Sequence, residues 1–221
     1  VVVFGSADHN IYGVDAKKGK QLWKIETSAA VLGAVTICDG TAYLGGSDGK
    51  FWAIDIHTGN KVWTFDGIKG YVETRPLIYG DKVIFGAWDE NLYALNRKDG
   101  TLLWAWHDGR RGMLYSPAAV WPVATQNRVF IAAPDRFLSC IDATSGKTLW
   151  RTNESTVRET VGLSEDSTRV FSKTMRDSVV CFSTAGDAPR KIWATNVGFG
   201  YEIAPSMPVE KDGVVFGSTM N

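Results

Sequence analysis

The chain has 221 residues, 44% of them hydrophobic, with 24 Lys and Arg against 24 Asp and Glu. A chain of this length buries a sizeable core without a disulfide or a metal ion. Its zero net charge removes the usual driving force for binding nucleic acid or an anionic membrane surface, so we expect neither partner. No apolar run approaches the roughly 20 residues of a spanning helix, which excludes a transmembrane segment.

A ten-residue motif recurs along the whole chain. Four copies align without a gap: VDAKKGKQLW (14–23), IDIHTGNKVW (54–63), LNRKDGTLLW (95–104) and IDATSGKTLW (141–150). A fifth, degenerate copy has two extra residues and ends at Trp193. The copies therefore end at Trp23, Trp63, Trp104, Trp150 and Trp193, at intervals of 40, 41, 46 and 43 residues. A period of this size indicates stacked supersecondary units.

Each motif follows a segment that predicts a β-hairpin. The clearest segments are VFGSADHNIY (3–12), YLGGSDGKFW (43–52), IFGAWDENLY (84–93) and FIAAPDRFLS (130–139). In each, a β-branched or alternating run ends at an Asp suited to a turn, and a second run returns. A third strand carries the Trp and a fourth follows a loop. Four short strands per repeat predict an all-β fold, a β-propeller of four-stranded antiparallel blades.

The motif has a physical explanation. A glycine supplies the positive φ of the turn between the second and third strands, at Gly19, Gly59, Gly100 and Gly146. The Trp four residues later offers a large flat face, which we expect to lie against that glycine backbone and against a small side chain of the adjoining blade. The small position is occupied by Gly13, Ala53, Ala94, Cys140 and Cys181. We therefore interpret Cys140 and Cys181 as small hydrophobes, with no metal or redox role.

These motifs identify a family. The pattern A-x-D-x-x-x-G-x-x-x-W, complete in AIDIHTGNKVW (53–63) and nearly so in two other copies, resembles the tryptophan-docking repeat of PQQ-like (quinoprotein-type) β-propellers. The array as a whole resembles the propeller lipoproteins of the outer-membrane barrel-assembly machinery. The resemblance covers essentially all of residues 1–221, and the copy that ends at Trp193 departs from it most. By resemblance only, it implies a periplasmic, cell-surface or extracellular location.

The strand count predicts an incomplete ring. Five blades could close only if the strand PSMPVE completed the first blade, but GVVFGSTMN nearly repeats the opening VVVFGSAD and would then have no place. We therefore expect residues 1–221 to form a single propeller segment of about five blades and the start of a sixth. Relatives of this type carry seven or eight blades, so we expect a longer native polypeptide.

Catalytic and metal motifs are absent from the sequence. GGSDG (45–49) matches G-x-S-x-G formally, but a nucleophile elbow requires a strand-to-helix turn and this segment lies in a hairpin. His9, His57 and His107 share no metal-ligand spacing. The hairpin residues Asp8, Asp48, Asp89 and Asp135 occur once per blade, which suits turn capping rather than catalysis.

The resemblance also bears on cofactors. Quinoprotein dehydrogenases hold their quinone with a vicinal cysteine disulfide, an aromatic floor and a calcium ion. Cys38, Cys140 and Cys181 are not adjacent in sequence, and no calcium set maps onto the chain. We expect no quinone, no other cofactor and no enzymatic activity from these residues.

One set of polar side chains is a candidate binding site. The loops that lead from each Trp strand into the next blade carry Tyr71, Glu73, Arg75, Tyr115, Arg158, Glu159, Tyr201 and Glu202, with Arg110 and Arg111 nearby. In a propeller such loops converge on one mouth of the central channel, where a rigid scaffold presents function. Alternatively, Arg and Glu of adjacent blades pair with one another and only fill a wet channel.

Two classes of function are compatible with these features. The first is a non-catalytic scaffold that binds a protein or peptide partner through its loops and strand edges, with a small ligand at the channel mouth as a variant. The second is an accessory propeller of a larger enzyme, a quinoprotein dehydrogenase or a hydrolase fusion. The full-length reading frame discriminates between them, because the fold alone does not supply the function.

Overall fold

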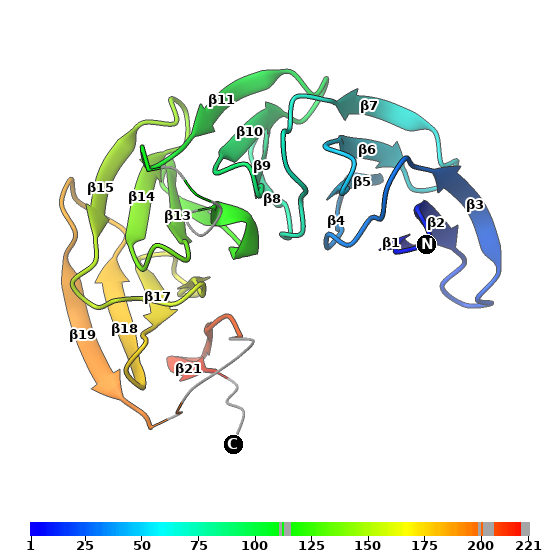
Figure 1. Cartoon of the computed structure of the whole chain (residues 1–221). Helices are drawn as coiled ribbons and strands as arrows, with labels where there is room; N and C mark the ends of the chain where they lie inside the picture. Colours follow the sequence, from blue (N-terminus) through cyan, green and yellow to red (C-terminus); the bar gives the residue numbers. More distant parts are fainter. Residues whose placement is uncertain (111, 113–115, 199, 201–205, 218–221) are drawn as a thin grey trace. The chain divides into compact units, whose positions relative to one another are not determined.

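The computed structural model describes residues 1–110, 112, 116–198, 200 and 206–217. The chain divides into two compact units, Val1–Ala118 and Ala119–Asn221. Apart from a short 3-10 turn at Pro117–Ala119, the regular elements of the described residues are β-strands (Figure 1). None of these residues forms a helix long and apolar enough to cross a membrane.

The first unit contains three antiparallel sheets in chain order. The first sheet is β1 (Val2–Ser6), β2 (Asn10–Val14) and β3 (Gln21–Glu26). The second is β4 (Thr36–Cys38), β5 (Thr41–Gly45), β6 (Phe51–Asp55) and β7 (Lys61–Phe65). The third is β8 (Leu77–Tyr79), β9 (Lys82–Gly86), β10 (Leu92–Asn96) and β11 (Leu102–Trp106). Each sheet is a meander whose neighbouring strands follow one another in sequence.

The second unit repeats this construction. One sheet is β12 (Val123–Thr125), β13 (Arg128–Ala132), β14 (Leu138–Asp142) and β15 (Thr148–Thr152). The next is β16 (Gly162–Leu163), β17 (Arg169–Lys173), β18 (Ser178–Ser183) and β19 (Lys191–Asn196). The last is a hairpin of β20 (Val209–Lys211) and β21 (Val214–Phe216). β20 pairs antiparallel with β21, and the two form a sheet of their own among the described residues. That this hairpin is the start of a sixth blade stays a prediction.

The ten-residue motif builds a tight turn between the second and third strands of a blade. The Asp55 carboxylate accepts hydrogen bonds from the backbone N–H groups of His57 and Thr58, at 3.0 and 2.8 Å. These bonds, with that from Thr58 in first place, hold the pKa of Asp55 below its usual value. The turn closes at Gly59, whose φ is +75° and whose N–H donates a hydrogen bond to the Asp55 carbonyl. The Asp and Gly of the motif are therefore turn residues.

The tryptophans join consecutive blades. Trp23 Nε1 donates a hydrogen bond to the carbonyl of Ile56, 2.8 Å away in the next sheet. Its ring lies so close to Gly59 that a Cβ there would meet the indole at 2.7 Å. Trp63 repeats both contacts, with the carbonyl of Arg97 and with Gly100.

The predicted docking is wrong for both contacts, because the structure exchanges the blades that supply the glycine and the small residue. The glycine under the indole belongs to the adjoining blade, whereas the small residue belongs to the same blade as the Trp, since Gly13 lies directly opposite Trp23 in the β2–β3 register. Strand pairing explains this difference. The Trp and the small residue are cross-strand neighbours on one face, so only a small side chain leaves space for the indole. Trp104 lies on β11, the last strand of the third sheet. Its docking on the following blade stays a prediction.

The core forms between neighbouring sheets. The first interblade core consists of Val3, Ile11, Trp23, Val31, Ala42, Leu44, Trp52 and Ile54, from β1 to β6. The second interblade core has the same construction around Trp63, with Phe51 stacked on Phe85 at a centroid distance of 3.9 Å. In both, the Trp of one blade faces two strands of the next. Because each core is shared by two neighbouring blades, a single blade cannot bury its apolar face alone and occurs in arrays.

Candidate functional site

The first group of candidate residues lies on the loop between β7 and β8. The Tyr71 ring lies 5.6 Å from the ring of Trp88, a residue of the β9–β10 hairpin tip. Trp88 Nε1 donates a hydrogen bond to the Glu73 carboxylate at 3.0 Å, and its backbone N–H bonds to the Tyr71 carbonyl. Glu73 is exposed and both rings are partly exposed. Tyr71, Glu73 and Trp88 therefore form a preassembled aromatic and carboxylate cluster, which we call the Trp88 cluster.

Asp89 fixes this loop to the hairpin. Its carboxylate accepts hydrogen bonds from the Tyr93 hydroxyl at 2.6 Å and from the backbone N–H of Lys69 at 2.9 Å. Burial, together with the Asp89 hydrogen bond, raises the pKa of Tyr93 above its usual value. The hydroxyl therefore stays protonated and continues to donate. Asp89 is a structural residue, in agreement with the predicted turn-capping role.

The second group lies in the second unit, around Arg158 and Glu159. Glu159 accepts a hydrogen bond from Arg136 Nη1 at 2.8 Å. Arg158 is only 6% exposed, and its Nε lies 3.3 Å from the sulfur of Met175. The Arg158 backbone N–H bonds to the carbonyl of Lys173 at 2.7 Å. Arg158 is therefore packed against the end of β17.

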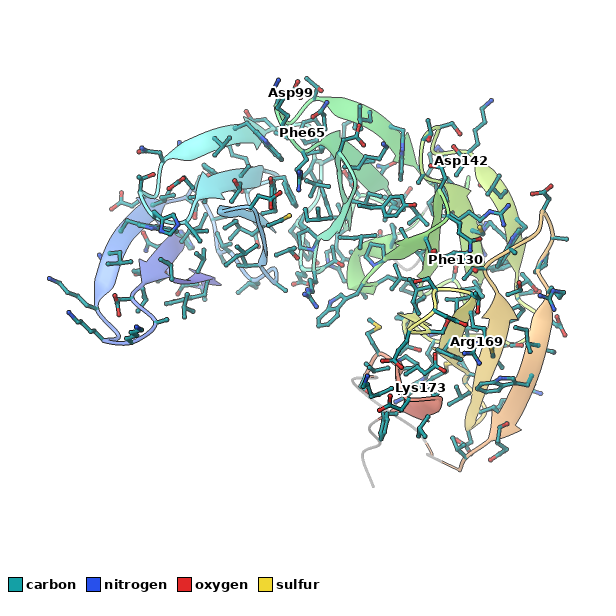
Figure 2. All side chains as sticks on the ribbon, turned by 180° about the vertical axis from the view of Figure 1, so that it is seen from behind. Phe65, Asp99, Phe130, Asp142, Arg169 and Lys173 are labelled. Atoms are coloured by element: carbon teal, nitrogen blue, oxygen red, sulfur yellow. The ribbon has the colours of Figure 1, made fainter. Side chains whose placement is uncertain are left out.

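Lys173 is the most unusual residue of that segment. It is 1% exposed, and its Nζ lies 3.2 Å from the Ser206 hydroxyl. The same position of the earlier blades holds Gly5, Gly45, Gly86 and Ala132. Figure 2 shows Lys173 beside the C-terminal hairpin, and Lys173 Cε would lie 3.2 Å from a Cβ added at Gly217.

The predicted site is described in part. Tyr115, Tyr201, Glu202 and Arg111 lie outside the described residues. Arg75 is exposed on the same loop as Glu73, and Arg110 forms an ion pair with Asp108 at 2.7 Å. The pairing alternative holds for Glu159, whose partner Arg136 belongs to the preceding blade. Convergence of all these residues on one channel mouth stays a prediction.

Sequence reasoning missed Trp88, Arg136 and Lys173. Trp88 occupies a hairpin position that holds Ala7, Ser47, Pro134 and Met175 in the other blades, so its size was the available signal. For Lys173 the signal was a charged side chain in a column of Gly and Ala. A residue that departs from the repeat consensus, as Trp88 and Lys173 do, is not required for building the blade and is therefore a candidate for another role.

The cysteines are consistent with their predicted packing role. Cys140 and Cys181 lie opposite Trp150 and Trp193 in the strand register, and both are fully buried free thiols. Burial raises the pKa of Cys140 to about 12 and that of Cys181 to about 11. Cys38 is partly exposed, and its sulfur lies 3.0 Å from Arg97 Nη1.

The described residues do not fit a metal or quinone site. No three His, Cys, Asp or Glu side chains among them are grouped closely enough to hold a metal ion. Phe51 and Phe85, for example, stack on each other between blades. The expectation that these residues bind no cofactor stays a prediction.

The known proteins that resemble this chain include assembly factors and quinoprotein dehydrogenases. It is 25% identical over 200 residues to the outer membrane protein assembly factor BamB of Nitrosomonas eutropha, covering 85% of this chain and 47% of that protein. It is 29% identical over 147 residues to a quinohemoprotein alcohol dehydrogenase of Comamonas testosteroni, covering 58% of this chain and 20% of the enzyme. The chain therefore spans less than half the length of these two relatives.

Solved structures include both of these kinds of protein. BamB of Moraxella catarrhalis matches 98% of this chain and 78% of its own, with a TM-score of 0.58 and 17% identity. The quinohemoprotein alcohol dehydrogenase ADHIIG of Pseudomonas putida matches 85% of this chain and 39% of its own, with a TM-score of 0.65 and 15% identity. At these identities the likeness establishes the fold alone, and it confirms the predicted β-propeller. The family model described as outer membrane protein assembly factor BamB matches residues 1–185, so the chain belongs to this PQQ-like propeller family.

Proposed function

We propose that this chain is a non-catalytic scaffold that binds a protein partner, as part of a protein related to the outer membrane protein assembly factor BamB. The Trp88 cluster carries the proposal. The Glu73 carboxylate and the Tyr71 ring hold the Trp88 ring in place before a partner binds. Little side-chain entropy is therefore lost on binding. Trp and Tyr are also the residues that contribute most to protein interfaces.

The partner is a component or a substrate of outer-membrane protein assembly. This proposal comes from the family match over residues 1–185 and from the BamB relatives. A periplasmic or cell-surface location belongs to the same proposal. Cell fractionation of the native organism checks the location, because recovery in the cytoplasmic fraction would contradict it.

Binding to the assembly proteins encoded in the same genome tests the scaffold role. The substitution Trp88→Ala is expected to weaken binding about tenfold or more, as removal of a buried aromatic anchor does. Lys18→Ala is the matched control, because Lys18 is an exposed residue of the turn between β2 and β3. Equal affinity of the wild-type chain and Trp88→Ala would remove the Trp88 cluster from the interface.

A second candidate function is an accessory propeller of a larger enzyme. The 29% identity with a quinohemoprotein alcohol dehydrogenase supports it, over one fifth of that enzyme. Titration of the chain with pyrroloquinoline quinone and Ca²⁺, followed by tryptophan fluorescence, separates the two proposals. Saturable quenching that requires Ca²⁺ would favour the enzyme, whereas the scaffold proposal expects no saturable change.

A further inference from the structure

The Trp88 cluster combines two aromatic rings with an exposed carboxylate. We propose that it binds an arginine side chain of the protein partner, whose guanidinium stacks on the indole of Trp88 and donates hydrogen bonds to Glu73. The inference rests on the proposed function, because it names the chemical group that the partner presents at the same site.

The cluster is an addition to a loop that the repeat already holds in place. The backbone N–H of Trp88 bonds to the Tyr71 carbonyl at 3.0 Å, and at the preceding blade junction that of Ser47 bonds to the Ala30 carbonyl at 2.8 Å. The residues of that junction that correspond to Tyr71, Glu73 and Trp88 are Ala30, Leu32 and Ser47. The preceding junction therefore forms the same backbone bond without an aromatic ring or a carboxylate at these positions, so blade packing does not require the cluster.

The hydrogen bond within the cluster leaves its carboxylate able to accept further donors. Trp88 Nε1 donates to Glu73 Oε2 at 3.0 Å, and no described residue donates to Oε1. The rings of Tyr71 and Trp88 lie at 35° to each other, with their centroids 5.6 Å apart, and both are partly exposed. The face of an aromatic ring carries partial negative charge and attracts a cation. A cation on the indole is therefore attracted by the ring and by the carboxylate together.

The charges around the cluster also favour a cationic ligand. The β7–β8 loop and the tip of the β9–β10 hairpin carry four carboxylates against two cations: Asp66, Glu73, Asp89 and Glu90 against Lys69 and Arg75. Asp89 accepts a hydrogen bond from the Tyr93 hydroxyl, and Glu90 accepts one from the backbone N–H of Gly112 at 2.7 Å. These donors are neutral, so they leave the negative charge in place. A basic segment of a partner is therefore the complementary ligand for this surface.

The guanidinium of arginine fits the cluster better than the ammonium of lysine does. It presents five N–H donors in one plane, so it can lie flat on the indole while its edge donates to Glu73 Oε1. It is also more weakly hydrated than an ammonium, so it loses less hydration when it packs on an aromatic surface. Both properties favour arginine as the side chain that the partner presents.

Titration with a single side chain tests this assignment without the whole partner. The chain is prepared with isotopically labelled tryptophan, and the Trp88 indole signal is assigned with Trp88→Phe. N-acetylarginine amide and N-acetylcitrulline amide are then added separately, because citrulline has nearly the shape of arginine but no charge. The arginine compound is expected to shift the Trp88 signal saturably and to bind about fivefold or more tightly than the citrulline compound.

A variant that removes only the charge of Glu73 gives the sharper test. Glu73→Gln keeps an oxygen that accepts the Trp88 indole N–H, so the cluster stays assembled, and the arginine compound is expected to bind about threefold more weakly. Asp66→Asn is the matched control, because Asp66 is an exposed carboxylate of the same loop, seven residues earlier. It is expected to change the affinity by less than about 1.5-fold at about 0.15 M salt, where exposed charges are screened.

Four results would overturn the assignment. The first is equal affinity for the arginine and citrulline compounds, and the second is equal affinity of Glu73→Gln and the wild-type chain. The third is equal affinity for N-acetyllysine amide, which would remove the preference for a guanidinium. The fourth is the absence of a saturable shift of the Trp88 signal up to about 100 mM of the arginine compound.

The arginine assignment and the scaffold proposal fail separately. If Trp88→Ala weakens binding of the assembly proteins but the arginine compound does not bind, the scaffold role stands and the arginine assignment is wrong. If the arginine compound binds but Trp88→Ala leaves binding of the assembly proteins unchanged, the cluster recognises arginine outside that interface. The scaffold proposal then loses the observation that carries it.

Discussion

Trp63 Nε1 donates a hydrogen bond to the carbonyl of Arg97, 34 residues further along the chain and 3.0 Å away. One side chain thereby joins two blades through a polar bond and a ring face at once, because Gly100 lies under the indole. Trp23 makes the same hydrogen bond with the carbonyl of Ile56, so two consecutive blade junctions share it.

The glycine under each indole is expected to be irreplaceable for reasons of packing. Gly59 and Gly40 have nearly the same φ, +75° and +76°, but a Cβ meets Trp23 at 2.7 Å in one case and nothing within 4 Å in the other. Gly40→Ala should cost about 1–2 kcal/mol of unfolding free energy from backbone strain alone. Gly59→Ala should cost about 1–3 kcal/mol more from overpacking. Denaturant unfolding measures both, and equal losses would show that docking contributes nothing.

The indole N–H groups are expected to contribute different amounts to the unfolding free energy in different blades. Trp150 is 6% exposed, yet no described residue accepts a hydrogen bond from its Nε1, unlike that of Trp63. Trp63→Phe leaves the Arg97 carbonyl without its donor and should cost about 1 kcal/mol more than Trp150→Phe. Chemical denaturation of the two variants checks this order. A larger loss for Trp150→Phe would contradict the assignment.

Arg128 explains the missing bond of Trp150. The carbonyl of Thr184 occupies the repeat position of Ile56 and Arg97, and it accepts from Arg128 Nη1 at 2.9 Å. The same guanidinium bonds to the carbonyl of Gly186. Arg128→Met should therefore lower the unfolding free energy by about 1–3 kcal/mol. It should also slow exchange of the Trp150 indole N–H, which gains an acceptor. Two-dimensional NMR of labelled tryptophan detects this change, and faster exchange would refute the competition.

Thiol reactivity should separate the three cysteines. The raised pKa values of Cys140, about 12, and Cys181, about 11, keep both protonated at neutral pH, and burial denies access to reagents. Cys38 is partly exposed. An aromatic disulfide reagent should modify Cys38 alone in the folded chain and all three thiols in denaturant. Cys38→Ser is the control, and rapid native labelling of that variant would contradict the packing role of the other two.

Acid should weaken the turn that joins β16 to β17. Hydrogen bonds from the Ser164 hydroxyl first, and then from Thr168, lower the pKa of Asp166 from 3.8 to about 2. Because the folded-state value is depressed, the contribution of Asp166 to stability is present above about pH 4 and is lost as the pH falls toward about 2. The difference in Tm between the wild-type chain and Asp166→Asn should shrink over that interval. A constant difference would exclude the carboxylate as its cause.

The repeat made much of the fold predictable. The spacing of Asp, Gly and Trp predicts the turn at Asp55 and the five Trp strands, because each depends on residues close in sequence. The direction of docking was not predictable in this way. Whether Gly59 supports Trp23 or Trp63 depends on contacts between blades, whereas the motif shows only that Gly59 precedes Trp63 by four residues.

The candidate site was likewise predictable from the sequence only in part. The sequence found Tyr71 and Glu73 as polar loop residues, yet it gave no reason to join them to Trp88, which lies in another hairpin. It also treated Arg158 as an exposed channel residue, whereas the structure buries it beside Lys173. Burial depends on which loop packs over which strand end, and that is a tertiary property.

The sequence by itself determined the blade, because turn geometry and strand alternation are local and recur with the period of the motif. Only the tertiary structure decided which polar groups form hydrogen bonds. These pairs are Trp63 with the Arg97 carbonyl, Arg128 with the Thr184 carbonyl, and Trp88 with the Glu73 carboxylate. The physical reason is that hydrogen bonds and ring contacts act over a few ångströms between residues that are 15 to 56 positions apart in these pairs. Such pairs exist only once the blades have packed.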